Sequence, residues 1–131
     1  MKKKLSIFIA SLLIGICMLT GCAGQGIEGT WELYEEIEPS GNKLSQEDLK
    51  EIGVAETYVI EGDKVYYTCE TELMSKPIEI EFELEDLGSN QYNFILNGGF
   101  VFANPTVKGN TMTYDVGVEG DISTMIFKRV K

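Results

Sequence analysis

The sequence contains no histidine, and only three of its 131 residues are cysteines. Without histidine the chain cannot form Ser-His or Cys-His nucleophilic pairs, nor can it hold zinc through imidazole ligands. Cys17 and Cys22 lie in an N-terminal segment for which we expect processing. Cys69 is then left alone, which excludes an intramolecular disulfide. We interpret Cys69 as a small buried residue on a strand, with a reactive thiol as the alternative.

The chain also lacks an apolar run long enough to cross a membrane as a helix. Its uncharged, mostly apolar N-terminal run covers the 16 residues 5–20, whereas a spanning helix needs about 20. Lys2, Lys3 and Lys4 precede this run. A positive start followed by an apolar core of this length is typical of a secretory signal peptide. We therefore expect residues 1–21 to direct export from the cytoplasm and then to be removed.

The apolar run ends in Leu19-Thr20-Gly21-Cys22, which resembles the lipobox of bacterial lipoproteins. The resemblance implies cleavage between Gly21 and Cys22, a diacylglycerol on the Cys22 thiol and acylation of the new N-terminus, with palmitate as the expected chain. An ordinary signal peptide followed by an unrelated cysteine is the alternative. In the lipoprotein interpretation residues 22–26 form a lipidated tether that reaches at most ~17 Å. The expected location is extracytoplasmic, on the outer face of the cytoplasmic membrane.

Basic residues are scarce in the mature chain. Three of the 11 basic residues and none of the 21 acidic ones precede Cys22, so 8 basic and 21 acidic residues remain, with a net charge of −13. A surface of this charge disfavours nucleic acid and anionic lipid headgroups. Apart from the membrane that holds the lipid, the expected partners are a small apolar molecule or a cationic protein.

From Ile27 onward, short runs of alternating apolar and polar residues are separated by Gly, Asn and Asp, which predicts β-strands. A short helix is predicted over 46–52, with Ser45 as N-cap, Asp48 as its capping-box partner and Gly53 at the C-terminal stop. Pro105 indicates a strand end or a bulge. The eight expected strands cover residues 27–37, 56–61, 64–71, 77–84, 91–97, 100–103, 111–116 and 122–130.

The predicted fold is all-β. It is one domain over residues 27–131, an eight-stranded antiparallel up-and-down barrel with a short helix between the first two strands. Closure into a barrel pairs every strand edge. A two-sheet sandwich is the alternative, but successive hairpin connections favour the barrel.

Gly29-Thr30-Trp31 resembles the G-x-W signature of lipocalins, and the layout is similar to the short lipocalin-like (calycin-type) barrels of bacterial lipoproteins. The closing strand with residues 124–128 fits the same resemblance. The resemblance implies that a basic residue near the end of the barrel packs over Trp31. By position this residue is Arg129, with Lys128 as the alternative. The disulfide and C-terminal helix of secreted lipocalins are absent.

The interior of the predicted barrel is lined by bulky aromatic residues. Eight strands enclose a space that side chains fill or that holds one small ligand. Both outcomes, a filled core and a small apolar pocket, stay open at this point. The candidate ligand contacts are Trp31, Phe82, Phe94, Phe102, Tyr114 and Phe127.

A run of acidic residues lies along the strand over 77–84 and continues just beyond its end. We interpret it as a solvated outer face. Alternate residues of one strand are ~6.6 Å apart, so their carboxylates form a line and do not converge on one calcium ion. We expect no metal, no cofactor and no catalytic residue. The predicted function is a non-enzymatic binding module for a small apolar ligand. The alternative is a module that presents this face to a cationic envelope or host protein. The run comprises Glu79, Glu81, Glu83, Glu85 and Asp86.

Overall fold

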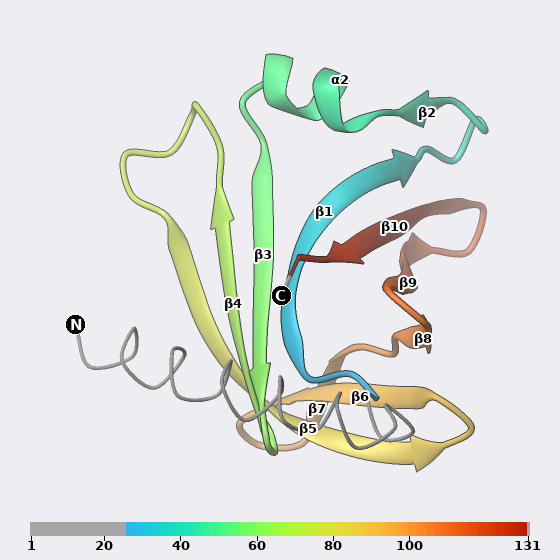
Figure 1. The fold of residues 1–131 in the computed structure, drawn as a ribbon. Coiled ribbons are helices and arrows are strands. Elements are labelled where there is room, and N and C mark those ends of the chain that lie inside the picture. Colours follow the sequence, from blue (N-terminus) through green and yellow to red (C-terminus); the bar gives the residue numbers. More distant parts are fainter. Residues whose placement is uncertain (1–25, 131) are drawn as a thin grey trace.

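The computed structural model describes residues 26–130, which cover almost all of the predicted domain (Figure 1). The expected signal peptide over 1–21, the lipid site at Cys22 and all but the last residue of the tether lie outside the described residues. No helix within 26–130 combines the length and the apolar character that crossing a membrane requires.

The described chain forms a closed antiparallel barrel of eight strands. β1 pairs with β3 on one side and with β10 on the other, so the sheet closes on itself. Neighbouring strands follow each other along the chain, and the barrel is therefore of the up-and-down type. The predicted barrel is confirmed, and the sandwich alternative is wrong. The ring consists of β1 (Gly29–Ile37), β3 (Ala55–Glu61), β4 (Lys64–Glu70), β5 (Ile78–Gly88), β6 (Gln91–Leu96), β8 (Thr106–Lys108), β9 (Thr111–Val118) and β10 (Asp121–Arg129).

Two short strands were not predicted. β2 (Lys43–Leu44) pairs with the end of β1, and its two residues are too few to show alternation. The predicted sixth strand corresponds to β7 (Phe100–Ala103), but the ring continues through β8 beyond Pro105. Proline has no N–H for the ladder, yet the Pro105 carbonyl accepts from the Tyr92 amide at 3.0 Å. The strand is therefore interrupted at Pro105, but the chain stays hydrogen-bonded to β6 there.

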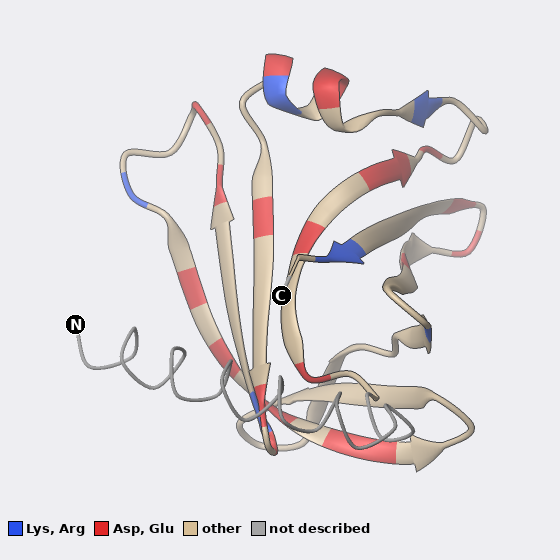
Figure 2. Cartoon of the chain, in the orientation of Figure 1, with Lys and Arg blue, Asp and Glu red and all other residues tan. Residues whose placement is uncertain are grey.

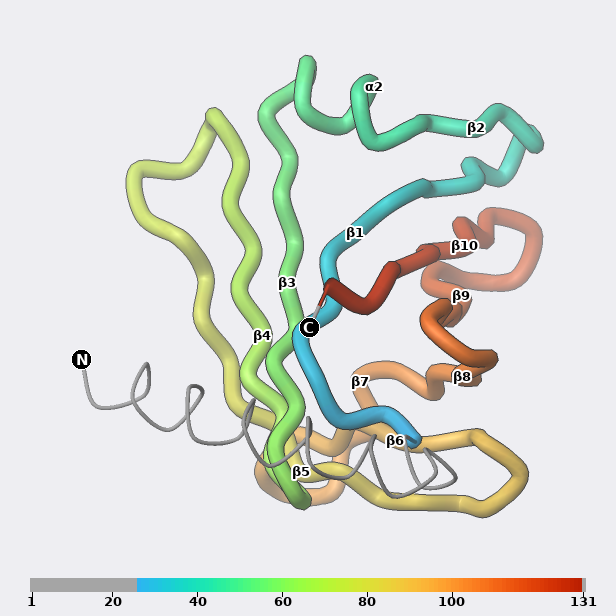
Figure 3. Tube along the Cα trace, in the orientation of Figure 1, coloured from blue at the N-terminus to red at the C-terminus, as the bar shows by residue number. Residues whose placement is uncertain are grey.

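β5 extends four residues beyond the predicted end at Leu84. Its first half pairs with β4 and its second half with β6, and Figure 3 shows it curving around one side of the barrel. Alternation stops at Glu85-Asp86, where two polar residues are adjacent, so the pattern offered no sign of the second half. The result is a single strand that turns a corner of the barrel.

The short helix forms as predicted. α2 (Gln46–Glu51) begins with a capping box in which the Asp48 amide donates to Ser45 Oγ at 3.2 Å and the Ser45 amide donates to Asp48 Oδ2 at 2.9 Å. Gly53 follows the helix at a φ of +76°, a left-handed conformation that favours glycine. Leu49 is buried against the barrel. Figure 1 shows α2 beside the start of β3.

The barrel has two ends, which we name by their contents. The Trp31 end holds the start of β1, the turns at 62–63, 89–90 and 109–110, and the end of β10. The helix end holds the connections 38–54, 71–77, 97–99 and 119–120. The core lies inside the barrel and contains Ile27, Trp31, Leu33, Leu49, Tyr58, Ile60, Val65, Tyr67, Phe82, Tyr92, Phe94, Ala103, Val107, Met112, Tyr114, Met125 and Phe127.

Candidate ligand site

The Trp31 end of the barrel is closed by the indole from which it takes its name. Trp31 has no exposed surface, and its Nε1 donates to the Ile27 carbonyl at 2.8 Å. The guanidinium carbon of Arg129 lies 4.4 Å from the centre of the indole ring, within the range of a cation–π contact. The two residues that the sequence analysis paired are therefore in contact.

Arg129 also holds several parts of the chain together. Its Nε donates to Asn110 Oδ1 at 2.9 Å, and its Nη2 donates to the carbonyls of Gly26 at 2.9 Å and Gly109 at 3.0 Å. Its Nη1 donates to the Glu28 carbonyl. These bonds join the start of β1 to the β8–β9 turn and hold this part of the Trp31 end together.

Lys128, the alternative partner for Trp31, points to the outside of the barrel. It alternates with the buried Phe127, its Nζ lies 5.3 Å from the centre of the Tyr34 ring, and it donates to Thr111 Oγ1 at 2.9 Å. Of the two basic residues, Arg129 and not Lys128 contacts Trp31.

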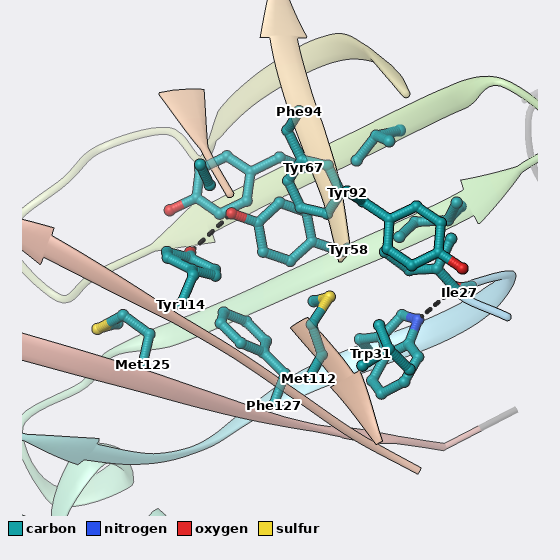
Figure 4. Packing of buried hydrophobic residues seen from close by; sticks show 14 of the residues in the cluster. Ile27, Trp31, Tyr58, Tyr67, Tyr92, Phe94, Met112, Tyr114, Met125 and Phe127 are labelled. Atoms are coloured by element: carbon teal, nitrogen blue, oxygen red, sulfur yellow. Dashed lines mark hydrogen bonds between the residues drawn. The ribbon is translucent and has the colours of Figure 1, made fainter. Parts of the chain in front are cut away.

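The predicted interior aromatics do face one another inside the barrel, and Figure 4 labels Trp31, Phe94, Tyr114 and Phe127 in the packed core. Phe82 stacks on Phe102 at 4.7 Å between ring centres, and Tyr114 on Phe127 at 5.7 Å. Phe102 is half-buried, and the other five predicted residues are buried.

Tyr58 was missed by the sequence analysis, although it lies at the centre of the core. Its ring is 4.9 Å from Phe94 and 5.0 Å from Phe127. The available signal was its alternation with Ile60 on the second predicted strand. That alternation indicates an inward face but does not place Tyr58 beside Trp31, its partner across β1 and β3.

Burial along the inward face changes from one end of the barrel to the other. On β9, which shows this most plainly, Met112 is fully buried, Tyr114 is 6% exposed and Val116 is 37% exposed. On β5, Phe82 is 1% exposed and Ile78 is 42% exposed. These residues alternate along their strands and so share the inner face. The inward side chains are therefore fully buried towards the Trp31 end, and the last of them on β5 and β9 are partly exposed at the helix end.

Exposed apolar side chains lie at the rim of the helix end, on two of its connections and on the strand ends beside them. Phe100 is 64% exposed and Leu73 is 98% exposed. Single exposed apolar residues are common on protein surfaces, but here they gather at the end where the inner face opens. The set comprises Ile52, Leu73, Ile78, Phe100, Val116 and Val118.

Polar groups lie between the packed and the open parts of the interior. The hydroxyls of Tyr58 and Tyr114 are 2.7 Å apart and share a hydrogen bond, and the Tyr67 hydroxyl donates to Glu56 Oε1 at 2.8 Å. Burial raises the pKa of all three tyrosines, so their hydroxyls stay protonated at neutral pH. Burial also raises the pKa of Glu56; the Tyr67 hydrogen bond opposes this rise and the charge of Glu36 adds to it.

Cys69 faces the same interior. It pairs with Glu56 across β3 and β4 and is half-buried. Burial raises the pKa of its thiol, although a hydrogen bond with Tyr67 opposes the rise. A raised pKa keeps the thiol protonated, whereas the thiolate is the reactive form. Its partial burial and raised pKa therefore favour the interpretation of Cys69 as a structural residue.

The predicted acidic face lies on the outside of β5. Glu79, Glu81 and Glu83 are exposed, and Figure 2 shows acidic residues along this strand. Lys64 Nζ lies 3.7 Å from Glu81 Oε2 and 3.6 Å from Glu83 Oε2. Within residues 26–130, no group of three or more cysteine and acidic residues is arranged to hold a metal ion.

No protein-family model matches the sequence, and no curated protein matches it. Several solved structures resemble the fold at low identity, including the following three. A REP1-NXSQ fatty acid transporter is 17% identical over 82% of this chain and 98% of its own, with a TM-score of 0.46. A Schistosoma mansoni fatty acid binding protein in complex with arachidonic acid is 18% identical over 81% and 97%, with a TM-score of 0.46. An asparagine-to-alanine variant of the fluorescent protein UnaG is 15% identical over 82% and 98%, with a TM-score of 0.47. These values assign the chain neither a relative nor a ligand.

Proposed function

We propose that the barrel is a non-enzymatic binding module that takes up a small apolar molecule through the helix end. The observation that carries this proposal is the change in burial along the inward face, from fully buried Met112 to 37% exposed Val116 on one strand. Binding of an apolar ligand removes apolar surface of this inner face from water, which lowers the free energy and so favours binding. The exposed apolar rim provides a surface over which such a ligand can enter.

The proposal predicts that a polar side chain at Val116 weakens uptake of a neutral apolar probe. Val116→Asn places an amide on the inward face of the helix end, where desolvating it opposes binding of an apolar group. We expect the dissociation constant for Nile red, measured by fluorescence titration, to rise at least tenfold. Leu87→Asn is the matched control, since Leu87 is 48% exposed near the other end of β5. We expect it to bind the probe like the wild type.

Two results would contradict uptake at the helix end. One is a wild-type protein that binds no Nile red. The other is an equal loss of binding in the Val116 and Leu87 variants, which would indicate a surface effect unrelated to the barrel interior. Thermal unfolding of both variants checks that the barrel is intact.

We also propose that the domain is held at the outer face of the cytoplasmic membrane by a lipid on Cys22. The support is the positive start, the apolar core and the Leu19-Thr20-Gly21-Cys22 motif. Two acyl chains give stable retention, whereas one chain is marginal. Cys22→Ala removes the thiol that would carry the lipid. It should abolish lipoprotein processing and leave an uncleaved precursor or a shed protein. Detergent phase partitioning measures this, and a variant of mature mass in the detergent phase would refute the lipid site.

The alternative function, docking of a basic protein on the outer face of β5, has weaker support. Lys64 lies beside both Glu81 and Glu83, so part of the negative charge of this face is already compensated. The glutamates of this face are exposed to solvent, and an ion pair between exposed groups gives little stabilisation. The interior at the helix end, where polar and apolar groups converge, is the better candidate.

A further inference from the structure

The helix-end interior has a polar lining whose hydrogen-bonding capacity is only partly used. Tyr58 is fully buried and Tyr114 is 6% exposed, and their two hydroxyls share one hydrogen bond. Two hydroxyls carry two hydrogens, and one bond uses one of them. Within residues 26–130, neither hydroxyl has a second hydrogen-bond partner. A buried donor without an acceptor costs free energy, so this position favours a ligand that brings an acceptor.

Next to this tyrosine pair is an acceptor that favours a donor. Glu56 Oε1 accepts one hydrogen bond from Tyr67, and a carboxylate has room for more. Glu56 is close enough to raise the pKa of both Tyr58 and Tyr114. A hydroxyl or amide bound here can therefore donate to Glu56 and accept from the tyrosine pair at once.

The charge of this interior opposes an anion. Glu36 pairs with Met125 and Glu56 with Cys69, which puts both carboxyl groups on the inner face near the helix end. Lys43 and Lys128 point away from that face, because the adjacent residue in the sequence of each strand points inward. Arg129 lies at the Trp31 end. Within the described chain, the inward strand positions of the helix end thus carry two acids and no base. A ligand carboxylate would be repelled there, and the repulsion is stronger in a partly buried site than in water.

We propose that the ligand is an amphiphile with an apolar tail and a head group that donates hydrogen bonds and is not an anion, recognised by Glu56 and the Tyr58–Tyr114 pair. Long-chain alcohols and amides meet both requirements. A protonated long-chain amine donates to Glu56 but has no acceptor for the tyrosine pair, and the anion of a free fatty acid at neutral pH has no donor. The inference rests on the proposed function, since it assumes uptake at the helix end. It adds the polarity of the head group, which the apolar rim alone does not determine.

The test compares three ligands with the same tail. Decan-1-ol, decylamine and decanoate are titrated against the purified full chain carrying Nile red, at neutral pH, and displacement is followed by fluorescence. We expect the alcohol and the amine to displace the probe at concentrations at least tenfold lower than decanoate. The alcohol and amine arms separate hydrogen-bond donation from positive charge. Decanoate that binds as tightly as either of them would overturn the inference while leaving uptake of apolar ligands intact.

A charge-matched pair of variants locates the discrimination. Glu56→Gln removes the inner charge but keeps the shape and an acceptor for Tyr67, so we expect decanoate to bind several-fold tighter and decylamine several-fold weaker. Glu79→Gln makes the same charge change on the outer face, where Glu79 is exposed. We expect it to leave all three affinities within about twofold, because salt screens charges beyond ~8 Å.

Two further results decide between the proposals. Equal responses of the Glu56 and Glu79 variants would show that net charge, not the interior, selects the head group, and would overturn the inference. Failure of all three ligands and of Nile red to bind would overturn the proposed function itself. If Glu56→Gln unfolds, Glu36→Gln serves as the second inner variant with the same expected direction for decanoate.

Discussion

Trp31→Ala is expected to unfold the domain or nearly so at room temperature. Trp31 has no exposed surface and closes one end of the core. Replacing a buried Trp by Ala removes about 3–5 kcal/mol, a large share of the 5–15 kcal/mol that stabilises a typical small domain. The change also removes the ring under Arg129 and the Nε1 donor to the Ile27 carbonyl. Urea unfolding followed by circular dichroism measures the loss.

Trp31→Phe is the matched variant for this prediction. It keeps an aromatic ring in the core but removes the Nε1 hydrogen bond and part of the volume. We expect a folded protein with an unfolding free energy about 1–3 kcal/mol below that of the wild type. A Trp31→Ala protein with the wild-type urea midpoint would show that the indole does not close the barrel. Solvent-like fluorescence of the native indole would show the same.

Arg129→Ala is expected to lower the free energy of unfolding by about 1.5–3 kcal/mol, the range for hydrogen bonds to a charged group. The guanidinium donates to the carbonyls of Gly26, Glu28 and Gly109, and Arg129→Ala leaves these acceptors to water. The contact with Trp31 is lost as well. Because Gly26 and Glu28 precede β1, hydrogen exchange should also show faster opening at the start of that strand.

Arg129→Lys separates the charge of this side chain from its shape. A lysine keeps the positive charge and part of the stem, but its ammonium is a point charge and cannot reproduce a planar fork that serves several acceptors. We expect it to recover less than half of the loss caused by Arg129→Ala. Wild-type stability of Arg129→Lys would show that charge near Trp31 suffices and that the several hydrogen bonds contribute nothing measurable.

Elements with strong local patterns were predictable from the sequence. Ile78, Ile80, Phe82 and Leu84 alternate with glutamates, and β5 presents Phe82 inward and the glutamates outward. Ser45, Asp48 and Gly53 determine the ends of α2 through contacts within a few residues. The second half of β5 and β8 were missed, because pairing with neighbouring strands holds them in the sheet where their own residues show no clear alternation. β5 pairs with β6 there, and β8 pairs mainly with β9.

The candidate site was predictable only in part. Alternation indicated which aromatic residues face inward, and the resemblance of Gly29-Thr30-Trp31 to the lipocalin signature pointed to Arg129 as the partner of Trp31. The polar lining was not foreseen, because Tyr58 and Tyr114 meet across 56 residues of sequence and Tyr67 meets Glu56 from the neighbouring strand. A periodic pattern distinguishes an inner from an outer face but does not say which inner residues touch.

The sequence by itself determined that this protein is a small, strongly acidic all-β domain without histidine, with a barrel as the favoured closure of its eight strands. Only the tertiary structure decided at which end of the barrel the inward side chains are fully buried and at which end they are partly exposed. That difference arises because Arg129 joins segments about a hundred residues apart at the Trp31 end, while the inner face at the helix end stays partly exposed from Ile78 to Val116. Burial is a property of the closed barrel as a whole, so no single strand encodes it.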